Sequence, residues 1–440
     1  MHKYLLCFFQ LLFLFTGRVH SSGLYIPAIY SDNMMIQADT PSTISGSATP
    51  FQSVSLRIEA RVIQATAEKD GSWTILLPAF RAGYAFDMEI TAGDEKRMIR
   101  NVIAGDVWLC SGQSNMEMNA GRTDVKDAIH TIPAGIRYFV DQSPPSPTPS
   151  DKLNGHWVVC SPENAAGCSA VALSFALHLI PRLGRPVGLV INAKGGTPIE
   201  SWTDLYTLQN KEYDQTIFQR REQWKKDREK YELQYQHSID SAKAKKIFPP
   251  FQIRENWNPA SLYNSLVYPI RRLAFKGVIW YQGESNADLP FIYRYQLADM
   301  IHSWRSLFQQ PHLPFFIIQL PEYRNTDDWA VMRESQASVG LDNVWPVVSL
   351  GLGDTTNIHP VRKIELGRRV ALQVLAKAYH YNLTSSGPLF QTMKREGKKM
   401  ILTFDCGAGS LVSSDGQPIR NVEIAGSDPG FLPATTRIVG

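Results

Sequence analysis

The sequence of 440 residues predicts an α/β protein, in which a parallel β-sheet flanked by helices follows an antiparallel β-sandwich and precedes a short β region. Three patterns lead to this fold class. Apolar and polar side chains alternate at short spacing through residues 22–104, strands alternate with helices through residues 105–382, and strands and turns return in residues 383–440. Alternating strands and helices are typical of a parallel sheet with helices on both faces.

The first 21 residues are predicted to be a signal peptide. Lys3 precedes an apolar run from Leu5 to Phe15, and Val19 and Ser21 occupy positions −3 and −1 of a cut after Ser21. The run is short for a membrane span, and an uncleaved anchor is the alternative interpretation. We therefore expect an exported protein, periplasmic or secreted, with no stable membrane span after cleavage.

Residues 22–104 are predicted to form the β-sandwich. Apolar residues take every second position from Val54 to Ala60 and from Trp73 to Leu77, which is the pattern of strands with one buried face. The dipeptide Asp70-Gly71 favours a hairpin turn. Because this part of the chain has no helical period of any length, we expect two packed antiparallel sheets.

Residues 105–382 are predicted to form the α/β domain. Residues 205–256 are an insertion in it, and their stretch from Glu212 to Lys246 combines many charged residues with a helical period. We interpret this stretch as a solvated helix, with a lid over the site as the alternative. The expected helices span 170–180, 291–308 and 362–378, and the expected strands span 186–192, 271–281, 313–320 and 344–350.

The composition excludes several classes of function. The net charge of +4 falls to +2 when Lys3 and Arg18 leave with the signal peptide, so there is no electrostatic case for binding nucleic acid. No spacing of Cys and His resembles a metal site, and we expect no cofactor. Cys160 and Cys168 lie eight residues apart, which permits a disulfide in an exported protein.

Two segments suggest a nucleophile and a base. Ser114 follows a buried strand that breaks at Ser111-Gly112, which is how open α/β sheets present a nucleophile at their carboxyl edge. His359 lies between a strand and a helix and is the best placed of ten histidines to accept the proton of a serine. Taken alone, each residue is better explained as a helix cap or a surface group. Together, in this order, they are typical of a serine hydrolase.

Four motifs strengthen this interpretation. Gly112-Gln113-Ser114-Asn115-Met116, the run Gly195–Trp202, the run Trp280–Asn286 and Ile358-His359-Pro360 resemble the sialate O-acetylesterase family of the SGNH hydrolases, in the same order. The resemblance runs from Leu24 to the end of the chain. It implies a flavodoxin-like esterase fold and a carboxyl-terminal β domain, of which residues 383–440 are expected to be an incomplete or minimal version.

An acyl-transfer intermediate needs hydrogen-bond donors for its oxyanion. The backbone N–H groups of Ser114 and Gly196 are two candidates, because a glycine lets the chain approach an acyl group closely. The resemblance implies a third donor, a side-chain amide of the Trp280–Asn286 motif, which is either Gln282 or Asn286.

The acid of the triad departs from the resembled pattern. SGNH enzymes carry an Asp where this chain has Thr356, and sialate O-acetylesterases carry one where it has Asn357. The resemblance favours Glu284 as the carboxylate that supports His359. Asp354, Asn357 and a Ser–His dyad oriented by a backbone carbonyl are the alternatives.

We therefore expect a carbohydrate O-acetylesterase that removes acetyl groups from sialic acids through an acetyl-serine intermediate, without a metal. Gln113, Asn115, Arg122 and Trp202 are candidates for contacts with the sugar. The carboxylate of sialic acid calls for an Arg, for which Arg305, Arg333 and Arg362 are alternatives to Arg122. An acetylxylan or other polysaccharide acetylesterase is the nearest alternative, and a non-catalytic glycan-binding protein is an alternative of another class. The sequence does not determine the oligomeric state.

Overall fold

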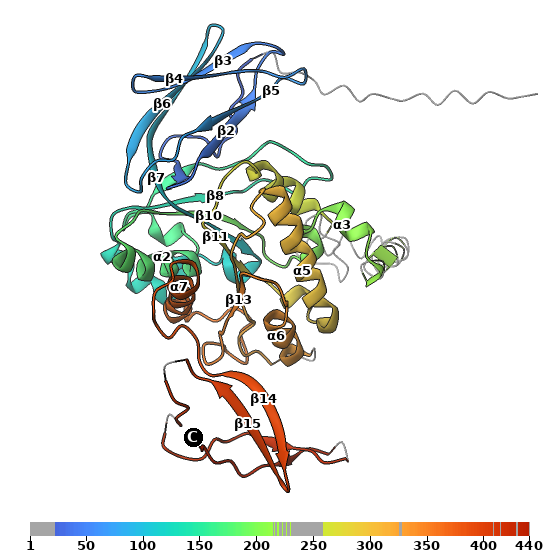
Figure 1. Cartoon of the computed structure of the whole chain (residues 1–440). Helices are drawn as coiled ribbons and strands as arrows, with labels where there is room; N and C mark the ends of the chain where they lie inside the picture. Colours follow the sequence, from blue (N-terminus) through green and yellow to red (C-terminus); the bar gives the residue numbers. More distant parts are fainter. Residues whose placement is uncertain are drawn as a thin grey trace, which may run out of the picture.

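The computed structural model describes residues 23–213, 258–324 and 328–439, except 408, 414, 428 and 429, together with scattered positions between 215 and 229. The predicted signal peptide and most of the predicted helical insertion lie outside the described residues. Figure 1 shows three parts in line: a β unit formed by the amino-terminal residues, a central α/β domain, and a carboxyl-terminal β hairpin. Within the described ranges, no helix is both long and apolar enough to cross a bilayer.

The amino-terminal unit consists of two packed sheets, as predicted. In one sheet β2 pairs with β5, and in the other the strands run in the order β4-β3-β6-β7 with β1 parallel to β7. The alternation confirms the expected buried face, since Val54, Leu56, Trp73 and Ile75 are all buried. The strands are β1 (Met35–Gln37), β2 (Ser42–Ser47), β3 (Ser53–Ile58), β4 (Arg61–Thr66), β5 (Ser72–Leu77), β6 (Ala85–Ala92) and β7 (Glu95–Gly112).

The turn at Asp70-Gly71 is present, but the hairpin expected there is wrong. Asp70 Oδ1 accepts a hydrogen bond from the N–H of Ser72 at 2.9 Å, which closes the turn. The strands on either side pair elsewhere, β4 with β3 and β5 with β2. The turn therefore carries the chain from one sheet of the sandwich to the other, which a dipeptide signal cannot distinguish from a hairpin.

A single strand, β7, links the sandwich to the central domain. Its first half pairs antiparallel with β6. From Asp106 onward it pairs in parallel with β10 (Val187–Ala193) and β11 (Gly277–Tyr281) of the central domain. The buried Asp106 carboxylate accepts hydrogen bonds from Arg185 Nε at 2.9 Å and from the Tyr379 hydroxyl at 2.8 Å. Arg185 and Tyr379 of the central domain therefore fix the point at which β7 passes from one sheet to the other.

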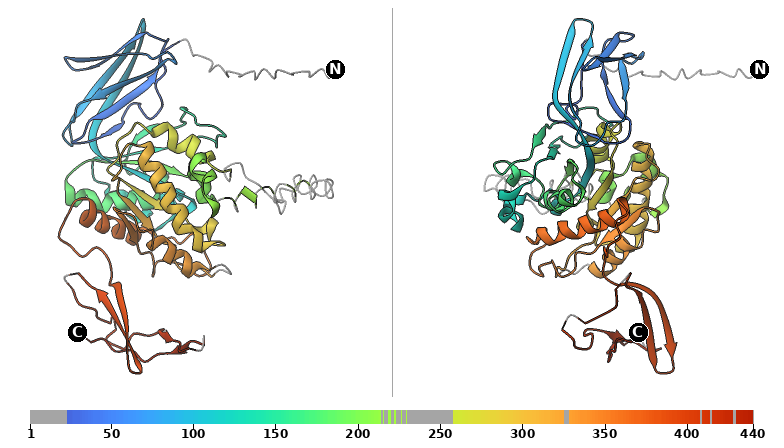
Figure 2. Two further views of the ribbon diagram at one scale, coloured as in Figure 1. Left: turned by 45° about the vertical axis from the view of Figure 1, so that its right-hand side comes forward. Right: turned by 60° about the vertical axis from the view of Figure 1, so that its left-hand side comes forward.

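The central domain is a twisted sheet in the order β13-β12-β11-β7-β10-β8-β9, with every pair parallel except β8 and β9. The pair α2 and α7 and the pair α5 and α6 lie on opposite sides of it (Figures 1 and 2). The strands are β8 (Ile136–Val140), β9 (Trp157–Val159), β10 (Val187–Ala193), β11 (Gly277–Tyr281), β12 (Phe315–Ile318) and β13 (Val344–Val347). The helices are α1 (Ser114–Glu117), α2 (Ala170–Leu183), α3 (Leu205–Gln209), α5 (Pro290–Leu307), α6 (Trp329–Ala337) and α7 (Lys363–Ala378).

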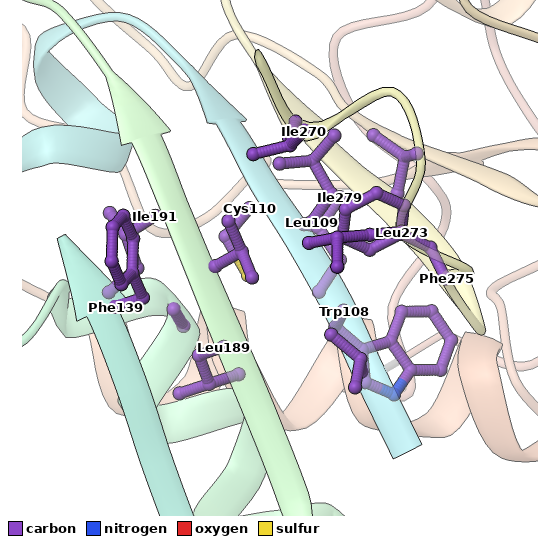
Figure 3. Packing of buried hydrophobic residues seen from close by; sticks show 14 of the residues in the cluster. Trp108, Leu109, Cys110, Phe139, Leu189, Ile191, Ile270, Leu273, Phe275 and Ile279 are labelled. Carbon is purple, nitrogen blue, oxygen red and sulfur yellow. The ribbon is translucent and has the colours of Figure 1, made fainter. Parts of the chain in front are cut away.

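The core of this domain fills both faces of the sheet, as expected for parallel strands. Figure 3 shows Cys110 and Trp108 of β7 beside Leu189 and Ile191 of β10 and Ile279 of β11. These residues are almost completely buried. The Trp108 ring also meets Phe175 of α2 edge-on at 5.2 Å, so the helix layer is tied to the central strand.

The sequence prediction differs from the structure in four places in this domain. The strand expected at 271–281 begins only at Gly277, after turns that include a π-helical one at Tyr263–Val267. Strands β8 and β9 and helix α6 were not expected. The disulfide is not formed: Cys160 and Cys168 are both buried and free, because each packs as a small apolar residue in the core.

The carboxyl-terminal region is an exposed β hairpin, as expected from its strand and turn signals. Strand β14 (Leu389–Glu396) pairs antiparallel with β15 (Lys399–Asp405), and the short strands β16 (Glu423–Ile424) and β17 (Leu432–Pro433) follow. Both views of Figure 2 place this region at the end of the molecule opposite to the sandwich.

Candidate active site

The nucleophile candidate is presented by the end of β7. Gly112 has φ of +140° and lies against β11, where a Cβ atom would be 2.1 Å from the Tyr281 carbonyl oxygen. Only glycine fits this position, and the next N–H, that of Gln113, donates to the same carbonyl at 3.0 Å. The chain then turns into α1, which places the half-buried Ser114 at the carboxyl edge of the sheet.

The base candidate comes from the loop between β13 and α7. His359 Nε2 lies 2.7 Å from Ser114 Oγ, which is hydrogen-bonding distance between residues 245 positions apart. The backbone N–H of His359 donates to Asn357 Oδ1 at 2.9 Å. The structure therefore brings together the two side chains that were expected to form the reacting pair.

The acid candidates do not reach the imidazole. Glu284 Oε1 accepts a hydrogen bond from Asn115 Nδ2 at 2.7 Å, not from His359. Asp354 Oδ1 accepts from Thr356 and is exposed, and Asn357 binds the backbone of His359. Among the residues that the structure describes, none hydrogen-bonds His359 Nδ1. The expectation that one of these three orients the ring by direct contact is corrected by this geometry.

Behind the reacting pair, Asn115 lies between two buried charged groups. Lys363 Nζ donates to Asn115 Oδ1 at 2.8 Å, while Asn115 Nδ2 donates to Glu284 Oε1 at 2.7 Å and to the Ile358 carbonyl at 3.0 Å. Asn115 and Lys363 are completely buried. The predicted role of Asn115 in sugar binding is therefore not supported, because its amide faces the interior.

The charges around the site shift its pKa values in directions that favour a neutral histidine. Burial lowers the pKa of His359, and the positive charges of Lys363 and Arg122 lower it further. Burial also lowers the pKa of Lys363, to about 7, against the opposing effects of Glu284 and Asp124. Burial raises the pKa of Glu284, although the hydrogen bond from Asn115 and the charge of Lys363 oppose it.

The loop that supplies Gly196 lies directly against the nucleophile. A Cβ atom on Gly195 would be 3.4 Å from Ser114 Cβ, and Gly196 has φ of +67°, a conformation that favours glycine. Glu117 Oε2 accepts a hydrogen bond from the N–H of Gly195 at 2.7 Å, so α1 and this loop are joined. The backbone of this loop therefore packs against Ser114 at Gly195.

The side-chain amides of the Trp280–Asn286 motif, which were expected to supply an oxyanion donor, form a hydrogen-bond network. Gln282 Nε2 lies within 3.2 Å of the oxygens of Gln113, Thr197 and Asn286, which are three acceptors for two protons. Gln282 is completely buried and has no proton left for an oxyanion. Asn286 Nδ2 donates to Glu200 Oε2 at 3.0 Å and retains one proton, so it is the better placed of the two.

Two of the other sugar-contact candidates are part of the packed interior. Trp202 is completely buried, with its Nε1 donating to Thr197 Oγ1 at 3.0 Å and its ring edge-on to Trp280, so it cannot touch a substrate. The Gln113 side chain is also buried, and its Oε1 accepts from Gln282 and from the N–H of Ser285. Arg122, by contrast, is exposed, and its positive charge contributes to the lowered pKa of His359.

Two charged residues near the pair were missed from the sequence. Lys363 is the first residue of α7, where a cation opposes the helix dipole, and this mismatch was a signal that it has another role. Glu117 ends the Gly-Gln-Ser-Asn-Met-Glu run and gave no separate signal. In the ranges that the structure describes, no group of three His, Cys, Asp or Glu side chains is placed to hold a metal ion.

Comparison with known proteins identifies the family to which this arrangement corresponds. A family model described as carbohydrate esterase, sialic acid-specific acetylesterase matches residues 104–247 and 251–376, which include all four motifs. The sialate O-acetylesterase of Mus musculus is 29% identical over 417 residues, covering 82% of this chain and 75% of its own length. The human sialate O-acetylesterase is 25% identical over 438 residues, covering 89% of this chain and 78% of its own length.

A solved structure also matches nearly the whole chain. A carbohydrate acetylesterase from Xanthomonas citri superposes with a TM-score of 0.82 at 30% sequence identity. The match covers 95% of this chain and 89% of that protein, so it includes the sandwich as well as the central domain.

Proposed function

This chain belongs to the sialic acid-specific acetylesterase family of carbohydrate esterases, and we propose that it hydrolyses O-acetyl groups on sialic acids through an acetyl-serine intermediate. The single observation that carries the proposed mechanism is the distance of 2.7 Å between Ser114 Oγ and His359 Nε2. A free serine is a weak nucleophile at neutral pH, and an adjacent neutral imidazole is the usual means of activating it.

In the proposed first step, Ser114 Oγ attacks the acetyl carbonyl carbon while its proton passes to His359 Nε2. The developing oxyanion receives hydrogen bonds from the backbone N–H groups of Ser114 and Gly196, with the remaining proton of Asn286 Nδ2 as a third candidate donor. The C–O bond to the sugar then breaks, the sugar oxygen takes the proton from His359, and acetyl-Ser114 remains.

In the second step, His359 takes a proton from water, and the resulting hydroxide equivalent attacks the acetyl-serine carbonyl. The bond to Ser114 Oγ breaks, Oγ recovers the proton from His359, and acetate leaves. The net reaction is one ester and one water giving one sugar hydroxyl and acetic acid. The lowered pKa of His359 supports this cycle, because the free imidazole is then the main form at neutral pH.

The preference for an acidic sugar rests on Arg122. Its guanidinium is exposed and close enough to His359 to influence the pKa of the imidazole, so a substrate carboxylate beside the acetyl group would meet a positive charge there. Acetylated xylan lacks that carboxylate and would gain nothing from Arg122. The charge therefore favours sialic acid over a neutral polysaccharide.

The test is to measure acetate release by mass spectrometry from O-acetylated sialic acid and from acetylated xylan with the same enzyme. We expect Ser114→Ala to abolish both activities. At a pH well above the midpoint, where His359 is neutral in both proteins, we expect Arg122→Gln to reduce only the activity on sialic acid. Arg61→Gln, on the exposed face of β4, is the matched control for the loss of a surface charge. Equal effects of Arg122→Gln on both substrates would contradict the proposed preference, and turnover by Ser114→Ala would contradict the mechanism.

A further inference from the structure

The 2.7 Å contact between Ser114 and His359 is formed with no carboxylate of the described part of the chain on the imidazole. In a Ser-His-Asp triad the aspartate both orients the histidine and stabilises its charge. Here the ring has no such partner among the described residues, so another group must fix the relative position of the two loops that carry Ser114 and His359. Asn115 and its two charged neighbours are the group that contacts both loops.

We propose that Asn115 is a positioning residue that holds Ser114 and His359 at reacting distance for the reaction proposed above. Its amide is hydrogen-bonded to Lys363 on one side and to Glu284 on the other, and these two residues form the clamp. It follows Ser114 directly in the chain. Its Nδ2 donates at 3.0 Å to the carbonyl of Ile358, the residue before His359. One amide group thus joins the nucleophile to the backbone of the base and, through Glu284, to the loop after β11.

The two charges allow only one orientation of this amide. Lys363 Nζ faces Oδ1, and Glu284 Oε1 together with the Ile358 carbonyl faces Nδ2. Turning the amide over would set its oxygen against a carboxylate and a carbonyl, and its NH₂ against an ammonium group. In a buried site these contacts are strongly unfavourable, so the orientation is fixed by electrostatics as well as by packing.

The loop that carries His359 is also anchored on both sides. After the histidine, Asp124 Oδ1 accepts hydrogen bonds from the N–H groups of Lys363 and Ile364 at 2.7 and 3.1 Å, which caps α7. Before it, Glu322 accepts from the N–H groups of Gly351 and Gly353. Asn115 supplies the remaining link, the one between this anchored loop and the nucleophile.

The direct test is Asn115→Leu, which keeps the branched shape of the side chain and removes every hydrogen bond of the amide. Gln37→Met is the matched control, because Gln37 is also a buried amide, bonded to Asp106 and to the N–H of Val107, but lies in β1 of the sandwich. Three quantities are measured: kcat and KM on p-nitrophenyl acetate, the rate at which diisopropyl fluorophosphate modifies Ser114 (by intact mass), and stability in urea. These small reagents report on the serine without any sugar contact.

We expect Asn115→Leu to lower kcat and the modification rate by about 10²-fold, the usual cost of misplacing a catalytic group by about 1 Å, while KM changes little. Gln37→Met should lose comparable stability and keep its kcat. If Asn115→Leu keeps kcat within about threefold of the parent while Ser114→Ala is inactive, the positioning role is refuted and the proposed function stands. If Ser114→Ala reacts like the parent, the proposed function itself fails.

A second variant covers the case in which Asn115→Leu does not fold. Lys363→Met removes one side of the clamp and also one of the two positive charges, with Arg122, that lower the pKa of His359. Because Asp124 and Glu284 then lose their counter-charge, the midpoint of kcat/KM against pH should move upward as kcat falls. Loss of the Lys363 charge can move the midpoint without any change in the position of Asn115, so the positioning role is read from kcat/KM on the plateau above the midpoint, where His359 is neutral. A plateau value equal to that of the parent would overturn the proposal.

Discussion

Replacing Gly112 by alanine tests whether the end of β7 controls the nucleophile. The new Cβ atom would lie 2.1 Å from the Tyr281 carbonyl oxygen, whereas real Cβ contacts essentially never fall below 3.0 Å. The two strands must therefore separate by at least 0.9 Å where they meet. The same carbonyl accepts the hydrogen bond from Gln113, the residue before Ser114, so the displacement passes directly to the serine.

The expected magnitude follows from this displacement and from the backbone conformation. A shift of about 1 Å at a catalytic group costs about 10²-fold in rate. A non-glycine residue at φ of +140° adds about 1–3 kcal/mol of strain, and overpacking adds about 1–3 kcal/mol more. Because a typical domain is stable by about 5–15 kcal/mol, the variant should fold but with much reduced stability.

The assay is the initial rate on p-nitrophenyl acetate, corrected for the folded fraction from urea unfolding. Gly83→Ala is the control, because Gly83 has φ of +86° but no atom within 4 Å of an added Cβ, so it has strain without a clash. We expect Gly83→Ala to lose some stability and no activity. If Gly112→Ala loses no more activity than this control, the register of β7 and β11 does not set the position of Ser114.

Four further results are expected. Ser114→Ala and His359→Ala should each abolish acetyl release. The double variant should release acetyl groups no more slowly than either single variant, because the two residues act as one unit. Additive losses of rate would show that they have separate roles. Activity should survive EDTA, since the sequence shows no ligand set for a metal, and a loss restored by zinc would reveal one. The value of kcat/KM should rise with pH as His359 loses its proton. The midpoint should lie below the ordinary histidine pKa of 6.5, because burial and the charges of Lys363 and Arg122 favour the neutral ring. A midpoint above 6.5 would contradict the assignment of His359 as the base. Glu284→Gln should lower kcat by about tenfold or less, because the carboxylate contacts Asn115 and not His359. Neutralising a triad acid lowers kcat by roughly 10⁴-fold, and a loss of that size would restore Glu284 as the acid.

Much of the fold was predictable because its signals are local. The apolar runs around β7 and β10 and the strand–helix alternation follow from burial and periodicity alone, and they place Ser114 at the carboxyl edge of the sheet. The contact of Ser114 with His359 was predictable from motif order, since both follow strands that end at the same edge. Helix α6 was missed because its amphipathic pattern is short and interrupted by polar residues.

The partners within the site were not predictable, because they depend on which way side chains turn after the strands end. Glu284 and Gln282 lie in the expected motif, yet one bonds Asn115 and the other fills a buried amide network. Trp202 also lies in a motif, but its neighbours Trp280 and Thr197 enclose it. Spacing along the chain fixes the loop that a residue belongs to, but it does not fix whether the side chain points to the substrate or to the core.

The continuity of β7 affects how this protein can be divided. The boundary expected between residues 104 and 105 falls inside one strand of 18 residues, whose last residue is Gly112. A shortened chain that begins at residue 105 would therefore start seven residues before the glycine that presents Ser114, and its Gly105 would lack the β1 residue with which it pairs. The sandwich therefore cannot be replaced like a domain on a flexible linker. Any replacement would have to supply the first half of β7, the same strand whose end positions Ser114.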